Sequence, residues 1–396
     1  MKNLLKKIIM VCVGGILFPT LSLSAPLDEF LTASPGFEPW HGEGEVGVDL
    51  MNNSVDVLGM RTDSYASTNS SVGNYRGGHV KGGLALTRRI WVDGGAWSRK
   101  ITTPYDSGES LTLHGAAQFQ VTQPFGWFPA VALRLSGWRN SADEAIKGSP
   151  TSLSFGGVSV DASRVRVENP HDNQVQLDMI STWNTSHNSA LSMFLSYGKS
   201  KVDFDKLFVN NLHAKTSTAE STVTGEMQIK QGSGQSNVDV VCVSSGGCNQ
   251  NVTFANGYLN ANVVQNDSIL LPSSAQAPDG MNIAYDANFY QAGGMYAWTG
   301  AEWRAKLGYR YIKLNRDVDE AVSAMGKKVI DSNHFLTGEI GYKPPFDWFE
   351  HFGFFVRGQA MSNQFVGEIP FTYNALSAHK FDARYGVVTL GVTGGF

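Results

Sequence analysis

The sequence predicts an antiparallel transmembrane β-barrel of about twelve strands. Three observations lead to this fold class: apolar and polar side chains alternate over stretches of about ten residues, the connections are short and long in turn, and no apolar run after residue 24 is long enough for a membrane helix. Alternation with period two puts successive side chains on opposite faces of a strand, which suits a wall between lipid and a polar interior. The composition agrees, with 43 glycines and only 17% charged residues.

The first 24 residues have the pattern of an export signal. Lys2, Lys6 and Lys7 precede an apolar run at 8–17, and small residues at 22–24 offer a cleavage site before Ala25. Residues 25–41 contain three prolines and are expected to form a periplasmic segment that either docks on a periplasmic partner or enters the barrel. The barrel itself is predicted over residues 42–396.

The clearest strand is 303–311, where Trp303, Ala305 and Leu307 alternate with charged residues. The segment 282–298 changes its alternation midway and suggests a β-bulge. The complete set of predicted strands is 43–51, 78–88, 90–100, 111–121, 129–139, 174–183, 189–204, 282–298, 303–311, 333–343, 351–363 and 380–396.

The lengths of the connections predict which end of the barrel faces the periplasm and which faces the outside. Short links of two to six residues join the strands in pairs, and links of about ten or more residues separate the pairs. Outer-membrane barrels have short periplasmic turns and long external loops, so both chain termini are expected on the periplasmic side. The expected periplasmic aromatic girdle consists of Trp127, Phe128, Trp183, Trp298, Trp303, Trp348 and Phe349.

The link 205–281 is much longer than an ordinary connection and must have structure of its own. We expect a folded external loop or an inward-folded constriction, with one further strand pair, and so fourteen strands, as the alternative. Cys242 and Cys248 lie in this link with two glycines between them, and in an oxidising compartment they predict a disulfide.

The inward face of the predicted strands carries many charges. Arg304, Lys306 and Arg310 form a basic ladder on one strand, and acidic residues on neighbouring strands predict a transverse field across a pore. The alternative is that the charges pair with one another and fill the interior. The lumen-lining candidates are Glu45, Asp49, Lys81, Arg134, Asp178, Asp286, Glu302, Arg304, Lys306, Arg310, Glu339 and Arg357.

The sequence offers no coherent catalytic set, metal-binding motif or cofactor motif. His187 stands beside Asn188 and Ser189, but a presumed turn explains these residues through backbone hydrogen bonds. His114 faces inward and is expected to be a wall residue. The formal net charge of −4 gives no reason to expect a nucleic-acid partner.

The export signal, the alternating final strand 388–396 and the terminal Phe396 together resemble Gram-negative outer-membrane β-barrel proteins. The resemblance implies that Phe396 is read by the barrel assembly machinery and that the protein meets outer-membrane lipids. A porin-like channel for passive diffusion of small hydrophilic solutes is the leading expectation. The alternatives are a surface adhesin, a polysaccharide-assembly barrel and a lipid-modifying enzyme, while the solute and the oligomeric state are left open.

Overall fold

The computed structural model describes most of the chain after residue 29. The described residues are 30–33, 39–51, 74–102, 106–147, 151–155, 158–231, 238–270, 284–324, 326–346, 352–363, 373 and 385–395. Among them, no helix is long and apolar enough to cross a membrane. The expected export signal at 1–24 and the terminal Phe396 lie outside these residues.

Twelve antiparallel strands form a closed barrel, as the sequence predicts. The first strand, β1, pairs with β2 on one side and with the last strand, β20, on the other, which closes the sheet on itself. The barrel strands in order are β1 (Gly42–Met51), β2 (Asn74–Thr87), β3 (Ile90–Thr102), β4 (Asp106–Thr122), β5 (Ala130–Ser141), β9 (His171–Ser186), β10 (Ser189–Asp203), β16 (Tyr285–Thr299), β17 (Trp303–Arg316), β18 (Ser332–Tyr342), β19 (Phe352–Met361) and β20 (Tyr385–Gly395).

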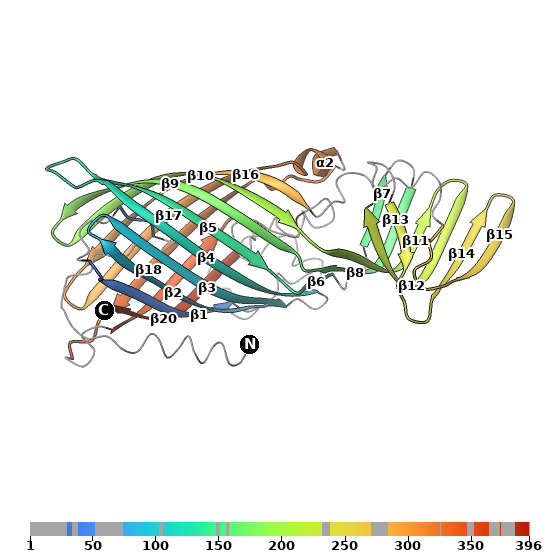
Figure 1. Cartoon of the computed structure of the whole chain (residues 1–396), viewed down its shortest axis with the longest axis horizontal. Coiled ribbons are helices and arrows are strands. Elements are labelled where there is room, and N and C mark those ends of the chain that lie inside the picture. Colours follow the sequence, from blue (N-terminus) through green and yellow to red (C-terminus); the bar gives the residue numbers. More distant parts are fainter. Residues whose placement is uncertain are drawn as a thin grey trace.

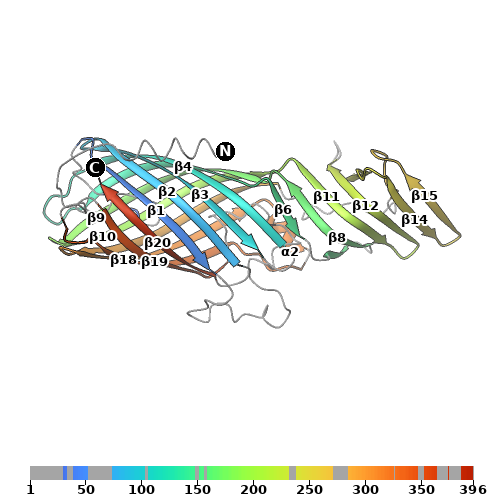
Figure 2. The ribbon, with the colours of Figure 1, turned by 90° about the horizontal axis from the view of Figure 1, so that it is seen from below.

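The two ends of the barrel differ, as Figures 1 and 2 show. The short turns lie at the same end as the start of β1 and the end of β20, because Gly42 and Gly395 belong to paired strand ends. The long connections leave from the other end. One of them contains the short helix α2 (Asp319–Ala324), whose Val322 is fully buried.

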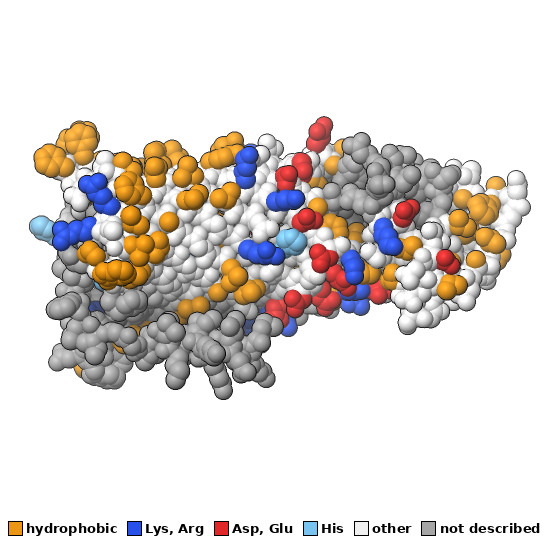
Figure 3. Space-filling view, viewed as in Figure 1, with side chains coloured by type: hydrophobic (Ala, Val, Ile, Leu, Met, Phe, Trp, Pro, Cys, Tyr) orange, Lys and Arg blue, Asp and Glu red, His pale blue; other side chains and the backbone are white. Residues whose placement is uncertain are grey.

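The outer surface of the barrel is apolar. Side chains that point away from the interior are 40–60% exposed, a burial that suits lipid contact and not a soluble core. Figure 3 shows these apolar side chains along the barrel, with charged side chains gathered where the barrel meets the rest of the molecule. Representative members are Val46, Val48, Leu113, Leu135, Leu177, Leu195, Leu307, Ile340, Val356 and Leu390.

Aromatic side chains lie beside the short turns, where the girdle is expected. Trp127 is 77% exposed and Trp303 is 51% exposed, and Phe128 stacks on Trp127. Trp183 is half-buried, so it exposes a smaller share of its side chain than Trp127 and Trp303 do. Trp348 and Phe349 lie outside the described residues.

Two of the long connections fold together into a sheet that extends beyond the barrel, which we call the extension (Figure 1). Its strands continue the barrel sheet through β4, β6, β8, β11, β12, β14 and β15 in turn. The strands of the extension are β6 (Glu144–Lys147), β7 (Thr151–Phe155), β8 (Val158–Glu168), β11 (Lys206–Lys215), β12 (Ala219–Gln231), β13 (Val238–Cys242), β14 (Cys248–Phe254) and β15 (Gly257–Val263).

The extension has a hydrophobic core of its own, which includes Leu212, Val223 and Met227. Cys242 and Cys248 form a disulfide inside that core, as expected, with their Cα atoms 5.9 Å apart. The alternative of fourteen barrel strands is wrong, because the strands of the long link pair with each other outside the closed barrel.

The expected bulge in the strand at 282–298 is also wrong. β16 pairs without a register shift with β10 from Tyr285 to Trp298 and with β17 from Ala287 to Thr299. Its inward residues alternate regularly from Tyr285 to Gln291, and the two glycines that follow make the sequence pattern look interrupted.

Candidate functional site: the barrel interior

The interior holds a group of charged side chains from five strands, which we call the ionic cluster. The register places Glu45 opposite Lys81, and it places Glu339 opposite both Lys306 and Arg357. Directly opposite residues in an antiparallel pair project from the same face, so the fold itself brings these charges together. The members are Glu45 (β1), His79 and Lys81 (β2), Lys306 (β17), Glu339 (β18) and Arg357 (β19).

Arg357 lies at the centre of the cluster and bonds two carboxylates. Its Nη1 and Nη2 donate to Oε1 and Oε2 of Glu45 at 2.9 and 2.8 Å. Its Nε and Nη2 donate to Oε2 of Glu339 at 2.9 and 2.7 Å. A bidentate arginine–carboxylate pair is among the stronger polar contacts in proteins, so Arg357 fixes the position of both acids.

The other members complete the pairing. His79 Nε2 lies 2.8 Å from Oε1 of Glu45, and Lys81 Nζ lies 3.8 Å from the same oxygen. Lys306 Nζ lies 3.4 Å from Oε1 of Glu339. All six side chains are buried, and only that of Lys306 exceeds 5% exposure. Unpaired charges at such burial would cost several kcal/mol each, so the pairing is a requirement of the fold.

A second ionic pair lies on the strands that follow β2 around the barrel. Arg134 of β5 donates from Nη2 to Asp93 of β3 at 2.7 Å, and both side chains are at most 2% exposed. Asp178 of β9 lies opposite Arg134 in the register and accepts a hydrogen bond from Gln176. His114 also faces the interior, where it stacks on Trp138 with ring centres 4.7 Å apart.

These charges pair along the wall and do not face each other across an open space. Arg357 reaches the strand next to its own and the strand two places away, and Arg134 likewise reaches Asp93 two strands away. The sequence left two alternatives for these charges: a transverse field across a water-filled pore, or charges that pair with one another and fill the interior. In this conformation the contacts correspond to the second alternative.

Residues 30–33 lie inside the barrel, and all four are buried. The backbone N–H of Ala33 donates to Oγ1 of Thr182 at 2.8 Å, and Gln118 Nε2 donates to the backbone carbonyl of Thr32 at 3.0 Å. These contacts come from β9 and β4. The segment 25–41 was expected either to dock on a periplasmic partner or to enter the barrel. The position of its described residues 30–33 corresponds to the second alternative.

Phe30 packs against the cationic side of the interior. Its ring centre is 5.2 Å from Lys306 Nζ and 5.8 Å from Cζ of Arg357, which are cation–π distances. Gly308 makes room for the ring: a methyl group at that position would lie 3.2 Å from Cε1 of Phe30. A side chain at position 308 would therefore crowd the Phe30 ring, which lies against β17.

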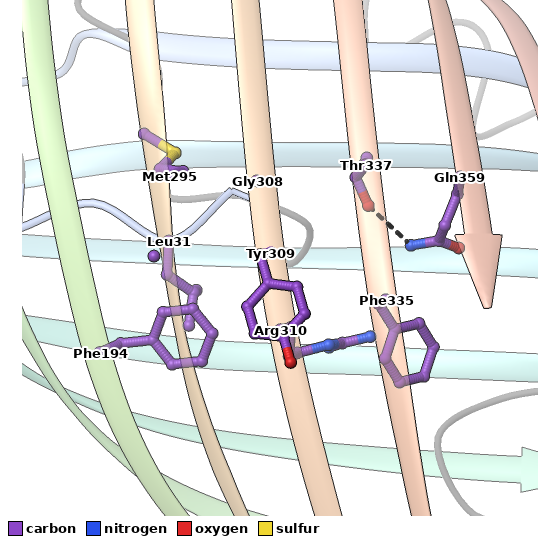
Figure 4. Close-up of a pocket in the computed structure, with 10 residues that line it drawn as sticks. Leu31, Phe194, Met295, Gly308, Tyr309, Arg310, Phe335, Thr337 and Gln359 are labelled. Carbon is purple, nitrogen blue, oxygen red and sulfur yellow. Dashed lines mark hydrogen bonds between the residues drawn. The ribbon is translucent and has the colours of Figure 1, made fainter. Parts of the chain in front are cut away.

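A small cavity of about 10 Å³ lies beside this segment, enough for about one water molecule. Figure 4 shows Leu31 and Phe194 on one side of it and Arg310 with Phe335 on the other. The guanidinium carbon of Arg310 is 4.4 Å from the centre of the Phe335 ring. Gln359 donates to Thr337 at 3.2 Å at the polar edge.

The end of the interior toward the long connections is apolar. Phe289, Ile312 and Leu314 point inward there and pack with Val322 of α2 and with Tyr373. The backbone N–H of Ile330 donates to the Tyr373 hydroxyl at 3.0 Å. Residues 30–33 and this apolar cluster thus both occupy space inside the barrel.

Ten of the twelve lumen-lining candidates point into the barrel. Asp49 accepts a hydrogen bond from Thr389 at 2.6 Å and lies 3.5 Å from His79. Arg304 Nη2 lies 3.5 Å from Glu339. The ten are Glu45, Asp49, Lys81, Arg134, Asp178, Arg304, Lys306, Arg310, Glu339 and Arg357.

The prediction is wrong for the other two. Asp286 is exposed on the outward face of β16, where it lies opposite Lys201 of β10, because the strand has no bulge to reverse its alternation. Glu302 is exposed and precedes β17, which begins at Trp303. It belongs to the short turn and not to the wall.

Sequence reasoning missed three members of the interior. The inward direction of Asp93 could not be predicted, because Trp91 and Trp97 on the same strand also point inward. With two aromatic residues, that face of the strand does not look polar in the sequence. His79 stands inward next to two glycines, where alternation gives little information. Phe30 has no strand pattern at all, so only the structure assigns it to the interior.

The described residues contain no group of three or more His, Cys, Asp or Glu side chains that could hold a metal ion. His187 lies in a turn in which Ser186 and Ser189 are hydrogen bonded at 2.7 Å. The N–H of Asn188 donates to Ser186 at 3.2 Å. These bonds are the ones that a turn requires.

No protein-family model and no curated protein sequence matches the chain. Several solved structures are similar to it at low identity. They include the NanC porin (6% identity, 89% of this chain and 98% of that chain, TM-score 0.38) and the translocator domain of the autotransporter NalP from Neisseria meningitidis (8%, 91% and 89%, 0.41). A third is the outer membrane protease OmpT from Escherichia coli (10%, 92% and 99%, 0.32).

These neighbours are all outer-membrane barrels, with activities that differ from one to the next. The fold of this chain stands on its own strand pairing: twelve strands close through β1 and β20, apolar side chains cover the outside, and charged side chains fill the inside. The chain is a twelve-stranded β-barrel of the outer-membrane type.

Proposed function

We propose that this protein is an outer-membrane channel for the passive diffusion of small hydrophilic solutes, closed by residues 30–33 in the conformation described. The observation that carries the proposal is the ionic cluster, which gathers charged side chains from five strands in the middle of the barrel. A wall of this kind suits a path that is hydrated in another conformation.

Stability alone gives no reason for such an interior. Replacing a buried ion pair with well-packed apolar residues is often neutral or stabilising, by about 1–4 kcal/mol. A barrel that served only as a membrane anchor would be at least as stable if apolar side chains filled its interior. The charges of the ionic cluster are therefore better explained by a role in contact with water and solutes.

Residues 30–33 are suited to leave the interior. They belong to none of the twelve barrel strands, and the hydrogen bonds from Ala33 and Gln118 hold them to β9 and β4. Removing them would uncover Lys306, Arg310 and Arg357 together. The apolar cluster around Val322 would remain as a second barrier, of the kind that opens when it becomes wet.

The test is conductance in planar lipid bilayers. The refolded protein is compared with a variant in which residues 30–33 are replaced by Gly-Ser-Gly-Ser, and the variant is expected to open more often and for longer. The matched control places the same four residues at 253–256, which are exposed in the extension, and should behave like the wild type. If neither protein conducts in its folded form, the channel proposal is wrong.

A second candidate is a surface-binding barrel, which the extension favours. Its own hydrophobic core and disulfide give it a stable shape, and Phe254 and Tyr258 are exposed at its far end. Deleting residues 210–275 discriminates the two functions. Loss of surface binding or polymer output with unchanged conductance would favour this candidate, and the reverse would remove it.

Export and assembly are part of the proposal. We propose cleavage before Ala25 and recognition of Phe396 by the assembly machinery. Amino-terminal sequencing of protein from outer membranes checks the first, and Phe396→Ser tests the second. A mature chain that begins elsewhere, or an unchanged yield of folded Phe396→Ser barrel, would contradict the respective part.

A further inference from the structure

We infer that the site now filled by the Phe30 ring binds small aromatic carboxylates when residues 30–33 leave it. We call this site the Phe30 seat and define it by Met295, Lys306, Gly308 and Arg357. The inference rests on the proposed function and gives it a substrate class. Its physical basis is a space that holds an aromatic ring beside two cationic side chains, Lys306 and Arg357.

The seat already holds an aromatic ring. Phe30 is 2% exposed, and its ring lies within cation–π range of both Lys306 and Arg357. Gly308 provides the space, since a methyl group there would approach the ring to 3.2 Å. A free aromatic ligand of similar width would meet the same two cations and the same gap in the side chains of β17.

The surroundings favour an anion over a neutral ring. Arg304 lies on the same inward face of β17; its buried Nε and Nη2 make no hydrogen bond, and Nη2 lies 3.5 Å from Oε1 of Glu339. A planar guanidinium matches the geometry of a carboxylate. Among the described residues, the charged side chains around the seat include the cations Lys81, Arg304, Lys306, Arg310 and Arg357 and the carboxylates Glu45, Asp49 and Glu339.

Two acids near the seat accept hydrogen bonds from Arg357, while Oε1 of Glu339 makes ion-pair contacts only. Glu45 accepts two hydrogen bonds from Arg357, and Glu339 accepts two from the same guanidinium. Arg304, Lys306 and Gly308 share one face of β17, because residues two apart on a strand point to the same side. An aromatic carboxylate with its ring over Gly308 can therefore point its carboxylate toward Lys306, with Arg304 next along the strand.

The first experiment measures binding and does not depend on conductance. Phe30→Ala empties the seat, and benzoate binding to the refolded variant in detergent is followed by isothermal titration calorimetry. Benzoate is expected to bind at least about tenfold more tightly to Phe30→Ala than to the wild type, in which Phe30 competes. Benzyl alcohol and hexanoate should each bind at least about tenfold more weakly than benzoate, since one lacks the charge and the other the ring.

The matched control is Phe289→Ala. Phe289 is a fully buried aromatic residue of β16 in the apolar cluster, so its removal leaves a similar space in an apolar setting. It should show no preference for benzoate over benzyl alcohol. Adding Lys306→Met to Phe30→Ala should remove the preference for benzoate while any weak binding of benzyl alcohol persists. If Phe30→Ala does not refold, the Gly-Ser-Gly-Ser replacement of residues 30–33 empties the same seat.

Equal binding of benzoate and benzyl alcohol, or no binding of benzoate to either emptied form, would overturn the inference. The two proposals fail separately. A barrel that binds benzoate but never conducts would support the benzoate site and contradict the channel proposal. A barrel that conducts without preferring benzoate would support the channel proposal and contradict the benzoate site.

Discussion

The guanidinium of Arg357 bonds both carboxylate oxygens of Glu45 across 312 positions of sequence. The two residues stand on β19 and β1, on either side of β20, the strand that closes the barrel. The bond therefore ties the last strands to the first strand from inside. Closure of the barrel and organisation of the ionic cluster depend on the same side chain.

Arg357→Met should destabilise the folded barrel by about 3–5 kcal/mol, because Glu45 and Glu339 would lose their buried counter-charge. Urea unfolding in lipid vesicles, followed by the mobility of folded and unfolded protein on gels, measures the change. Adding Glu45→Gln and Glu339→Gln should not recover the loss, because Lys81 and Lys306 would then lose their own buried counter-charges. Lys100→Ala, at a pair whose side chains are 59% and 67% exposed, is the control and should change little. An Arg357→Met barrel as stable as the wild type would contradict this role.

Replacing Arg304, Lys306 and Arg310 with glutamine should shift ion selectivity toward cations. These three side chains supply positive charge along one wall of the proposed path. The reversal potential in a salt gradient measures the shift, with the exposed turn residue Arg89→Gln as the control. An unchanged reversal potential in the triple variant would show that β17 does not line the conducting path.

The extension should be most stable in weakly acidic solution. His213 on β11 lies 2.7 Å from Glu220 and 3.3 Å from Asp161, and the hydrogen bond to Glu220, followed by that to Asp161, raises the pKa of His213 despite its partial burial. Stabilisation from a raised histidine pKa is complete below the unfolded value of about 6.5 and disappears as pH rises through the folded value.

The two acids set the lower limit of this range. A hydrogen bond from Ser152 and then the contact with His213 lower the pKa of Asp161, and the hydrogen bond with His213 lowers that of Glu220. Their contribution is lost as pH falls through these lowered values. The protection factors of the backbone amides in residues 206–231 against hydrogen exchange should therefore be highest between about pH 5 and 6.5. His213→Gln should flatten the profile on the alkaline side, and an unchanged profile would exclude His213 as its cause.

Removing the disulfide should loosen the extension and spare the barrel. Cys242→Ser with Cys248→Ser is expected to cost about 2 kcal/mol of local stability, since the bond closes a short loop within the core of the extension. Limited proteolysis should cut near residues 238–263 faster in the variant. The heat-induced mobility shift of the barrel serves as the internal control. Equal proteolysis of both proteins would show that the disulfide contributes nothing to this core.

Most of the barrel strands can be predicted from the sequence, because a strand between lipid and a polar interior must alternate apolar and polar side chains. The pattern around Leu307 and Tyr309 predicts both the strand and the inward direction of Lys306. The same rule predicts Glu339 and Arg357, whose contact needs only the register. It fails where apolar side chains point inward, as at Tyr285, Ala287 and Phe289 of β16, and this failure placed Asp286 inward.

The contents of the interior are harder to predict, because they depend on contacts between distant parts of the chain. Nothing in the residues around Phe30 indicates that they lie beside Gly308, 278 positions later. The bond between Arg357 and Glu45 likewise appears only when β20 closes the sheet. The strand pattern within 205–281 indicates structure, but only the pairing of β8 with β11 shows that two separate loops build one extension.

The central claim is that residues 30–33 close a path through the barrel. Oγ1 of Thr32 and Oγ1 of Thr182 are 3.3 Å apart, so Thr32→Cys with Thr182→Cys can lock the segment to β9 by a disulfide. Single-channel recording of this variant should be silent when oxidised and show discrete openings after reduction, while the wild type responds to neither treatment. Equal conductance in the oxidised and reduced states, or silence of the correctly folded barrel in both, would contradict the account.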